Sequence, residues 1–399
     1  MRLALVLASA LASLSTVAAA APDGGPSSVL GGMNAKSGDW PDVAAILFPD
    51  ASGDEALCTG ILVAPTVVLT AGHCYSDLDP PLPDNVLIGT STLARPKDGE
   101  VIAIKRAYVY PDPDTTEDIA VFVLAHASSR TPRKIVDGWA RLDLTNGAQV
   151  SLVGFGAINA DGDQFIDELQ QATSTITDVG CTVSAGCNPG AQPDGELGAG
   201  GMGVDTCPGD SGGPLYLMTS YGPVLAGVTS RSYDNPTLPC SGGGIYVRPD
   251  KVLDWIEQVA GVPVSRVGGP KAGALSAVHG DGTDTRISVN DPASDAHSFE
   301  ITAPPAHGMA NVRGDGAIRV CTDPAAAPGD DQVTVMITDT KHPDRALPLT
   351  IPIHIQDGTP PKSCDINAFS ESGCSAGGPA ALPVALAALG LARRRRRRA

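Results

Sequence analysis

The stretch from Val29 to about Gly261 consists of short apolar runs separated by turn-forming residues. Glycine and proline, with 46 and 34 residues, supply most of these interruptions. This spacing favours many short strands over long helices and is typical of antiparallel sandwiches and barrels. Examples of these runs are Val43–Phe48, Gly60–Leu69, Val86–Ile88, Val101–Ile104, Ile119–Leu124, Val150–Phe155 and Val224–Thr229.

The same stretch ends in a segment with helical periodicity. Apolar residues stand at positions 252, 255, 256 and 259, which lie on one face of a helix over 251–259. Asp250 is its expected N-cap. Residues 262–275, rich in Gly, Pro and Ala, are predicted to be a linker.

Residues 276–357 show a second pattern, with apolar residues at every other position. Half-buried strands have this period, so we expect a small β-sandwich, whose pattern resembles bacterial Ig-like or cadherin-like modules. Pro348 and Pro352 indicate that its last strand is an edge. The alternating positions are Ile287/Val289, Phe299/Ile301, Val333/Val335/Ile337 and Ile351/Ile353/Ile355.

Four aspartates of this second segment offer oxygen ligands of the kind that Ca²⁺ binds. Solvated acidic loops are the alternative interpretation, and it is the one adopted: no metal and no cofactor are predicted. The residues are Asp281, Asp284, Asp291 and Asp295.

The N-terminus reads as a secretory signal peptide over 1–20, with Arg2 before the apolar run Leu3–Leu14. Ala18 and Ala20 suit cleavage by signal peptidase after Ala20, whereas a core helix is the alternative. Residues 21–28 are small and polar, and we interpret them as a pro-segment.

The C-terminal segment 358–399 combines Cys374, the apolar stretch Pro379–Ala392 and six arginines at Arg393–Arg398. This resembles bacterial C-terminal sorting tails, most closely the myxobacterial type and next the Gly-Gly type. The resemblance implies transient membrane association, cleavage near Cys374 by a sorting protease, and display at the outer cell surface. An uncut membrane anchor is the alternative.

Charge and cysteine content bound the possible partners and the compartment. The formal net charge of −17 repels phosphate backbones, so nucleic-acid binding is excluded. Nine cysteines suit an oxidising compartment, in agreement with a secreted or extracellular protein.

Three short motifs carry the chemistry: Thr70-Ala71-Gly72-His73-Cys74, Asp118-Ile119-Ala120, and Cys207-Pro208-Gly209-Asp210-Ser211-Gly212-Gly213-Pro214. A serine hydroxyl is a weak nucleophile that needs a neighbouring base, and histidine suits that role because its pKa is near neutrality. A carboxylate then holds the base in one tautomer. Glycines beside the serine allow the backbone to approach a substrate carbonyl.

These motifs, in this order, resemble the trypsin/chymotrypsin-like serine peptidases over about Val29–Gly261. The resemblance implies an all-β fold of two six-stranded antiparallel β-barrels with a C-terminal helix. His73 is then the general base, Asp118 its orienting carboxylate and Ser211 the nucleophile. The amides of Gly209 and Ser211 form the oxyanion hole. An inactive relative is the alternative.

The resemblance also assigns a specificity pocket. Asp205 corresponds to the pocket base that selects Arg or Lys, Gly244 keeps the pocket open, and Ser230 contacts substrate backbone. A surface aspartate is the alternative for Asp205. Arg231-Ser232 departs from the family, which often has an aromatic residue and then Gly, so we expect Arg231 to repel basic residues and Ser232 to narrow the pocket.

Activation is implied in the same way. Val29-Leu30-Gly31-Gly32 resembles the family's mature N-terminus, whose free amine pairs with the carboxylate of Asp210. Ser28 precedes the cut, where trypsin-type zymogens usually have Arg or Lys. A separate activating protease is therefore expected.

Disulfides Cys58–Cys74 and Cys207–Cys240 are implied by the resemblance, and Cys181–Cys187 is expected as a local bridge. The family's usual Cys at the position of Gly198 is absent. Cys321 pairs with Cys364 in one interpretation, whereas in the other Cys364 pairs with Cys374 and leaves Cys321 free. Taken together, the sequence predicts a peptidase acting on proteins or peptides, with a catalytically quiet surface adhesin as the alternative.

Overall fold

The computed structural model describes residues 29–49, 55–76, 82–110, 118–182, 186–188, 195–233, 238–294, 296–359 and 363–369. The chain divides into two compact units between Gly269 and Pro270, and the short segment Asn290–Asp295 is assigned to the first. The predicted signal peptide, the pro-segment and the sorting tail with Cys374 lie outside the described residues. Among the residues described, no helix is long and apolar enough to cross a membrane.

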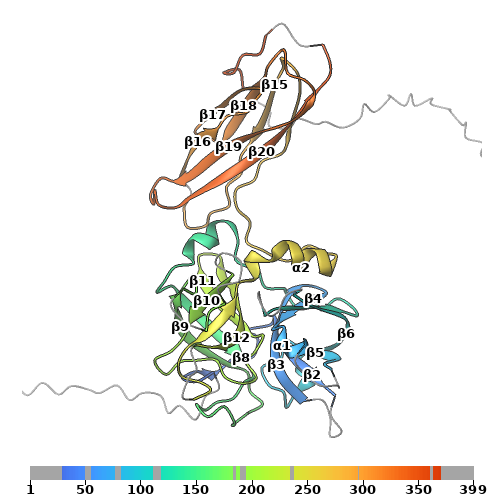
Figure 1. Ribbon diagram of the computed structural model, residues 1–399, viewed down its shortest axis with the longest axis vertical. Coiled ribbons are helices and arrows are strands. Elements are labelled where there is room, and N and C mark those ends of the chain that lie inside the picture. Colours follow the sequence, from blue (N-terminus) through green and yellow to red (C-terminus); the bar gives the residue numbers. More distant parts are fainter. Residues whose placement is uncertain are drawn as a thin grey trace, which may run out of the picture. The chain divides into compact units, whose positions relative to one another are not determined.

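A closed six-stranded antiparallel barrel forms the first half of unit one (Figure 1). Its strands pair in the order β2-β3-β4-β7-β6-β5. The predicted run 60–69 is divided between two of them, because Pro65 and Thr66 form the turn of a hairpin. The strands are β2 (Val43–Phe48), β3 (Glu55–Ala64), β4 (Val67–Thr70), β5 (Asn85–Ile88), β6 (Glu100–Val109) and β7 (Ala120–Leu124).

A second antiparallel barrel follows, in which β8 pairs with both β9 and β11 and so closes the sheet. The two-residue strand β1 (Met33–Asn34) pairs antiparallel with the first two residues of β9, Gln170 and Gln171. The apolar runs named from the sequence do not include β9, whose residues are mostly polar, the four-residue strands β10 and β13, or β11. The barrel strands are β8 (Gln149–Gly154), β9 (Gln170–Asp178), β10 (Glu196–Ala199), β11 (Pro214–Thr219), β12 (Gly222–Ser232) and β13 (Gly244–Val247).

The two barrels share one hydrophobic core, which contains Val43 and Ile61 from the first and Val153 and Leu225 from the second. A buried polar contact also joins them. The carboxylate of Asp42 pairs with the guanidinium of Arg133 and accepts a hydrogen bond of 2.5 Å from the hydroxyl of Tyr216. These contacts hold the facing surfaces of the barrels together, and the motif residues lie along that boundary.

Short helical segments complete unit one. The C-terminal helix α2 spans Leu253–Ala260 and follows the 3₁₀ turn η3 (Pro249–Lys251). The prediction that Asp250 caps this helix is wrong, because its carboxylate pairs with Arg141 and Arg248 instead. The others are α1 (His73–Ser76), η1 (Pro96–Asp98) and η2 (Gly138–Asp143).

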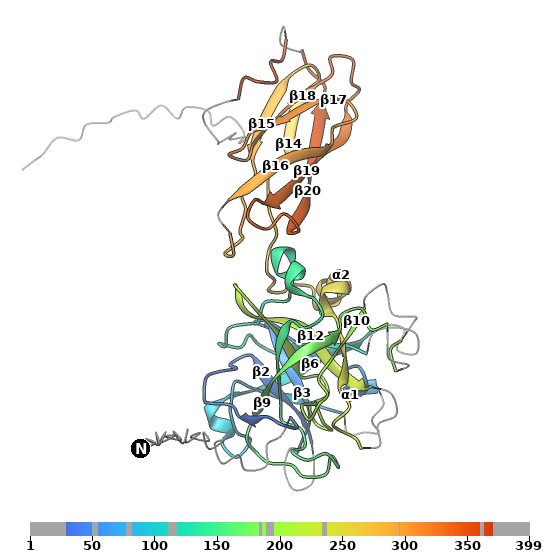
Figure 2. The same cartoon turned by 90° about the vertical axis from the view of Figure 1, so that its left-hand side faces the viewer.

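The second unit consists of a four-stranded sheet, ordered β14-β20-β19-β16, and a three-stranded sheet, ordered β15-β18-β17 (Figure 2). The predicted alternation over 333–337 and 351–355 is confirmed, since its apolar residues are at most 2% exposed. The strands are β14 (Leu275–Val278), β15 (Gly282–Arg286), β16 (His297–Ala303), β17 (Gly308–Val312), β18 (Ala317–Thr322), β19 (Gly329–Asp339) and β20 (Ala346–Gln356).

Two predictions for this unit need correction. Residues 287–289 lie outside any strand, and the amide of Ile287 donates to the carbonyl of Gly316. The last strand, β20, is not an edge along its whole length, because Ile353–Gln356 pairs with β14. Pro348 and Pro352 precede the residues of β20 that pair with β14, so at these two positions β20 has only β19 as a neighbour. Proline, which has no amide proton to donate, is tolerated where a strand is paired on one side alone.

Candidate active site

The loop that carries Ser211 comprises residues 207–213 and leads into β11; we call it the serine loop. Its turns are closed by hydrogen bonds from Asp210 to the Cys207 carbonyl and from Gly213 to the Asp210 carbonyl, at 2.9 and 2.7 Å. Gly212 has a φ of +79°, and a Cβ there would lie 2.1 Å from the hydroxyl oxygen of Thr70. Glycine is therefore required for the loop to pack against the end of β4.

His73 lies just beyond that end of β4, at the start of α1. Strand β4 pairs with β7 so that Thr70 is opposite Ala120, and Asp118 stands two residues before Ala120. This register places Asp118 beside His73 although 45 residues separate them. The sheet thus brings the first two predicted residues together.

The carboxylate of Asp118 is surrounded by hydrogen-bond donors. It accepts from the backbone amide of His73 and pairs with Nδ1 of the same residue, each at 2.8 Å. It also accepts from the hydroxyl of Ser230 at 2.7 Å. Burial is the strongest influence and favours the neutral acid, but these contacts together outweigh it and lower the pKa of Asp118 below its ordinary value. Asp118 is therefore an anion that fixes the orientation of the imidazole.

Backbone contacts place Ser211 close to the turn that carries His73. Its carbonyl accepts from the amide of Thr59 at 2.9 Å and lies 3.8 Å from Sγ of Cys74, the residue after His73. Gly209, two residues before it, has a φ of +94°. The imidazole and the carboxylate thus lie in contact, and the backbone of Ser211 lies beside Cys74, the residue that follows His73. A serine, an imidazole and a carboxylate brought together are suited to acyl transfer.

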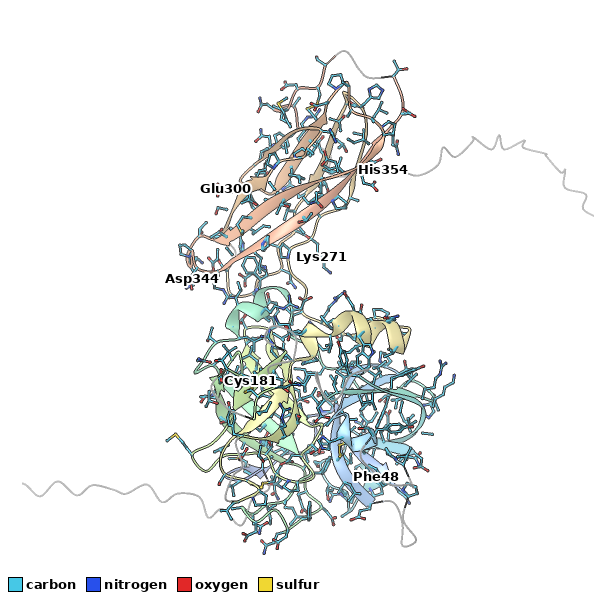
Figure 3. All side chains as sticks on the ribbon, in the orientation of Figure 1. Phe48, Cys181, Lys271, Glu300, Asp344 and His354 are labelled. Carbon is cyan, nitrogen blue, oxygen red and sulfur yellow. A yellow bond between two sulfur atoms is a disulfide. The ribbon has the colours of Figure 1, made fainter. Side chains whose placement is uncertain are left out.

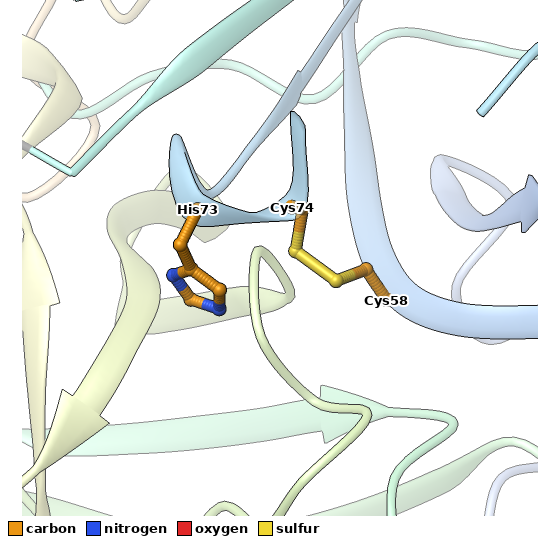
Figure 4. Close-up of side chains that lie close together, drawn as sticks. All are labelled: Cys58, His73 and Cys74. Atoms are coloured by element: carbon orange, nitrogen blue, oxygen red, sulfur yellow. A yellow bond between two sulfur atoms is a disulfide. The ribbon is translucent and has the colours of Figure 1, made fainter. Parts of the chain in front are cut away.

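Cys58, His73 and Cys74 form a compact group of metal-ligating residue types (Figure 4). The two sulfurs are joined in a disulfide, so neither offers the thiolate that a metal requires. The disulfide instead anchors the turn that carries His73 to β3.

The three other disulfides are Cys181–Cys187, Cys207–Cys240 and Cys321–Cys364. Cys181 lies in the loop that follows β9 (Figure 3). Of the two interpretations for Cys321, the structure contains the one that pairs it with Cys364.

Asp205 is buried, with 1% of its surface exposed. Its carboxylate accepts from the amides of Thr206, Ser241 and Gly243 at 2.8, 2.8 and 3.0 Å. Burial raises the pKa of Asp205, and these amides offset only part of that effect. The structure thus places Asp205 against the Ser241–Gly243 backbone, while Gly244 lies one residue further, next to Thr206 and Tyr246.

Both residues assigned to activation are fully buried. Val29 is 0% exposed, and the carbonyl of the following Leu30 accepts from the amide of Asp205 at 3.2 Å. Asp210 accepts from the amides of Cys207 and Gly156, each at 2.8 Å. Burial outweighs both amides and, with a smaller contribution from Asp205, raises the pKa of Asp210 to about 7.

The side chain of Arg231 has partners that the sequence did not reveal. Its guanidinium forms an ion pair of 2.8 Å with Glu196 and donates to the Ser230 hydroxyl at 3.1 Å. The positive charge is thus offset by the carboxylate of Glu196, which is almost completely buried; the predicted repulsion of basic residues by Arg231 stays a prediction. The sequence signal that could have identified Glu196 is its position as the single acidic residue at the start of the buried strand β10.

Tyr233 was also missed. A Cβ at Gly198 would lie 1.2 Å from the hydroxyl oxygen of Tyr233, so the ring covers this glycine. The tyrosine hydroxyl contacts Thr177 Oγ1 at 3.1 Å. An aromatic ring therefore fills the space beside the position where the sequence lacks the expected cysteine.

The first unit is similar to known proteins. A family model described as Trypsin matches residues 29–256, more than half of the chain. Serine protease 56 of Mus musculus is 32% identical over 255 residues, which cover 60% of this chain and 40% of that protein. Trypsin of Saccharopolyspora erythraea is 30% identical over 242 residues, covering 58% of this chain and 98% of that protein.

The chain matches about two fifths of the length of the first curated relatives. Among solved structures, the secreted serine protease VesC from Vibrio cholerae is 19% identical with a TM-score of 0.46. That match covers 83% of this chain and 72% of the solved chain.

Proposed function

Because the chain belongs to the trypsin family, we propose that it is a serine endopeptidase whose catalytic residues are Ser211, His73 and Asp118. The observation that carries the proposal is the ionised Asp118 carboxylate on Nδ1 of His73, beside the serine loop. A carboxylate on Nδ1 selects the tautomer whose Nε2 accepts a proton.

In the proposed reaction, the Ser211 hydroxyl oxygen bonds to the carbonyl carbon of the scissile peptide while its proton passes to Nε2 of His73. The carbon–nitrogen bond then breaks, and His73 returns that proton to the departing amine. Water next attacks the acyl ester and gives a proton to His73, which passes it to the departing Ser211 oxygen. Asp118 stays ionised throughout and stabilises the imidazolium. The amides of Gly209 and Ser211 donate to the oxyanion at each tetrahedral stage.

We propose cleavage after Arg or Lys, with Asp205 at the base of the specificity pocket. Support comes from its burial and from three backbone amides that stabilise the carboxylate without neutralising it. An apolar substrate side chain would leave this charge unpaired in a desolvated pocket. Ser230 and Gly244 complete the proposed substrate-binding residues.

Activation is proposed to follow cleavage between Ser28 and Val29 by another protease. The support is Asp210, a fully buried carboxylate whose pKa is raised to about 7 because burial outweighs its two amide hydrogen bonds. A new ammonium group at Val29 would lower that pKa by pairing with the carboxylate. Secretion, surface display and processing of the C-terminal tail remain proposals from the sequence, as do the boundaries at residues 29–261 and 276–357.

The second unit is proposed to be an Ig-like β-sandwich, with sheets of four and three strands as its support. Protein or peptide substrates, the activating protease, signal peptidase and a sorting protease are the proposed partners.

The decisive experiment uses the full chain with a cleavage site engineered immediately before Val29. The processed protein is exposed to a fluorophosphonate probe and assayed on Arg, Lys, Phe and Ala peptide substrates, with Ser211→Ala as the matched control. Labelling and turnover in the parent, both abolished in the variant, are expected. A folded, processed parent that neither labels nor cleaves would overturn the proposal and favour the surface-binding alternative.

A further inference from the structure

Thr59 lies in β3, next to the disulfide-bonded Cys58, and is fully buried. All of its polar groups are engaged around the serine loop. Its amide donates to the carbonyl of Ser211 at 2.9 Å, and its own carbonyl accepts from the hydroxyl of Thr70 at 2.8 Å. One residue of the first barrel thus holds a loop that belongs to the second.

The hydroxyl of Thr59 contacts two further backbone groups. It donates to the carbonyl of Gly209 at 2.9 Å and accepts from the amide of Phe155, just beyond β8, at 3.2 Å. A hydroxyl has one proton, so accepting from Phe155 leaves that proton for Gly209. The contact fixes the peptide plane that follows Gly209.

Fixing this plane matters because Gly209 has no side chain to restrict its backbone. With a φ of +94°, it adopts a conformation that glycine alone tolerates well, and its peptide planes rotate easily when unsupported. Its amide and that of Ser211 are the proposed oxyanion donors. Thr59 holds the carbonyl of each of these residues, one through its hydroxyl and one through its amide.

We infer that Thr59 is a positioning residue for the oxyanion hole, acting through the backbone of Gly209. This inference rests on the proposed function. Donors aimed at developing charge are effective only when they are held in place before the reaction, so loss of the hydroxyl weakens binding of the oxyanion more than binding of the substrate.

The test replaces Thr59 with Val, which keeps the shape and removes the hydroxyl, and with Ser, which keeps the hydroxyl. Thr90→Val is the matched control, since the buried Thr90 hydroxyl also donates to a carbonyl and accepts from an amide, those of Thr92. Each processed full chain is assayed on the substrate that the parent cleaves fastest. Inhibition by a peptide aldehyde, which forms an oxyanion on the enzyme, is compared with inhibition by the corresponding peptide alcohol, which does not.

For Thr59→Val we expect kcat to fall by about tenfold to a hundredfold with KM within about twofold, less than the loss of a donor itself. Aldehyde affinity falls by a similar factor while alcohol affinity does not change, and Thr59→Ser restores most of both. Thr59→Ala carries the same comparison if the valine variant does not fold. Equal loss in Thr59→Val and Thr90→Val, or equal weakening of both inhibitors, overturns the inference. A parent that fails to label with fluorophosphonate overturns the proposed function itself.

Discussion

At the scale of single residues, Asp210 shows how strongly burial alters chemistry. Its carboxylate is fully buried and has a pKa of about 7, compared with the ordinary value of 3.8. Below the ordinary value, Asp210 is protonated in both the folded and unfolded chains. Between the two values only the folded chain holds the proton, so the free energy of unfolding decreases as pH rises. Above about pH 7, Asp210 is ionised in both the folded and unfolded chains, so it no longer changes the free energy of unfolding with pH.

This gives a prediction for the uncleaved chain. From pH 5 to pH 8, the free energy of unfolding of the parent should decrease by about 3 kcal/mol more than that of Asp210→Asn, at 1.36 kcal/mol per pKa unit. Denaturant titrations of both proteins at the two pH values measure the difference. The raised pKa of Asp205 contributes to both proteins and largely cancels. Identical pH dependence in the two would contradict the assignment.

Asp205 provides the second prediction at this scale. In Asp205→Ser, kcat/KM for an Arg ester relative to a Phe ester should decrease by about a hundredfold or more, because the buried charge proposed to pair with a cationic side chain is lost. Asp161→Ser, at an exposed aspartate, is the control and should leave the ratio unchanged. A ratio that does not fall in Asp205→Ser would show that another group determines specificity.

At the scale of elements, the strands with clear apolar runs were predictable and those determined by long-range contacts were not. Val43–Phe48 is identical in sequence pattern and structure, because all six residues are buried. The residues of β9 are mostly polar, and this segment is a strand because β1, β8 and β10 all pair with it. The short β10 depends likewise on its neighbours, which no local pattern reveals.

The candidate active site likewise contains residues that the sequence could identify and contacts that it could not. Order and spacing of the motifs were sufficient to select His73, Asp118 and Ser211 as candidates. The contacts of Thr59, Glu196 and Tyr233 were not predictable, because each joins segments far apart in sequence through a buried hydroxyl, an ion pair or a ring.

The contact between β10 and the end of β12 gives a prediction of its own. Gly198→Ala should lower the free energy of unfolding by about 1–3 kcal/mol, because the new methyl group overlaps the ring of Tyr233. In a Tyr233→Ala background the same substitution should cost much less. A double-mutant cycle in denaturant measures this coupling, and equal costs in the two backgrounds would show that the ring is not the obstacle.

At the scale of the whole molecule, every residue proposed for catalysis or substrate binding lies in the first unit, before the boundary at Gly269. A chain ending at Gly269 should therefore fold, and after processing before Val29 it should cleave small peptides with kcat/KM within about twofold of the full chain. Steady-state kinetics on both proteins, with thermal unfolding to verify the fold, makes the comparison. A folded truncation that has lost activity more than tenfold would assign the second unit a part in catalysis.

The parallel pairing of β14 with β20 determines how the second unit responds to mechanical load. Leu275 lies opposite Ile353 and Val278 opposite Gln356, so the chain enters this sheet at one end of the pairing and leaves it at the other. Tension applied to the N-terminal end of β14 draws it along β20 and loads these hydrogen bonds in shear, while the Cys321–Cys364 disulfide passes tension from the C-terminal end directly to β18. An antiparallel pair joined at one end would instead unzip one bond at a time. The second unit should therefore resist tension applied at the start of β14 better than a unit whose first strand is held by an antiparallel pair joined at one end.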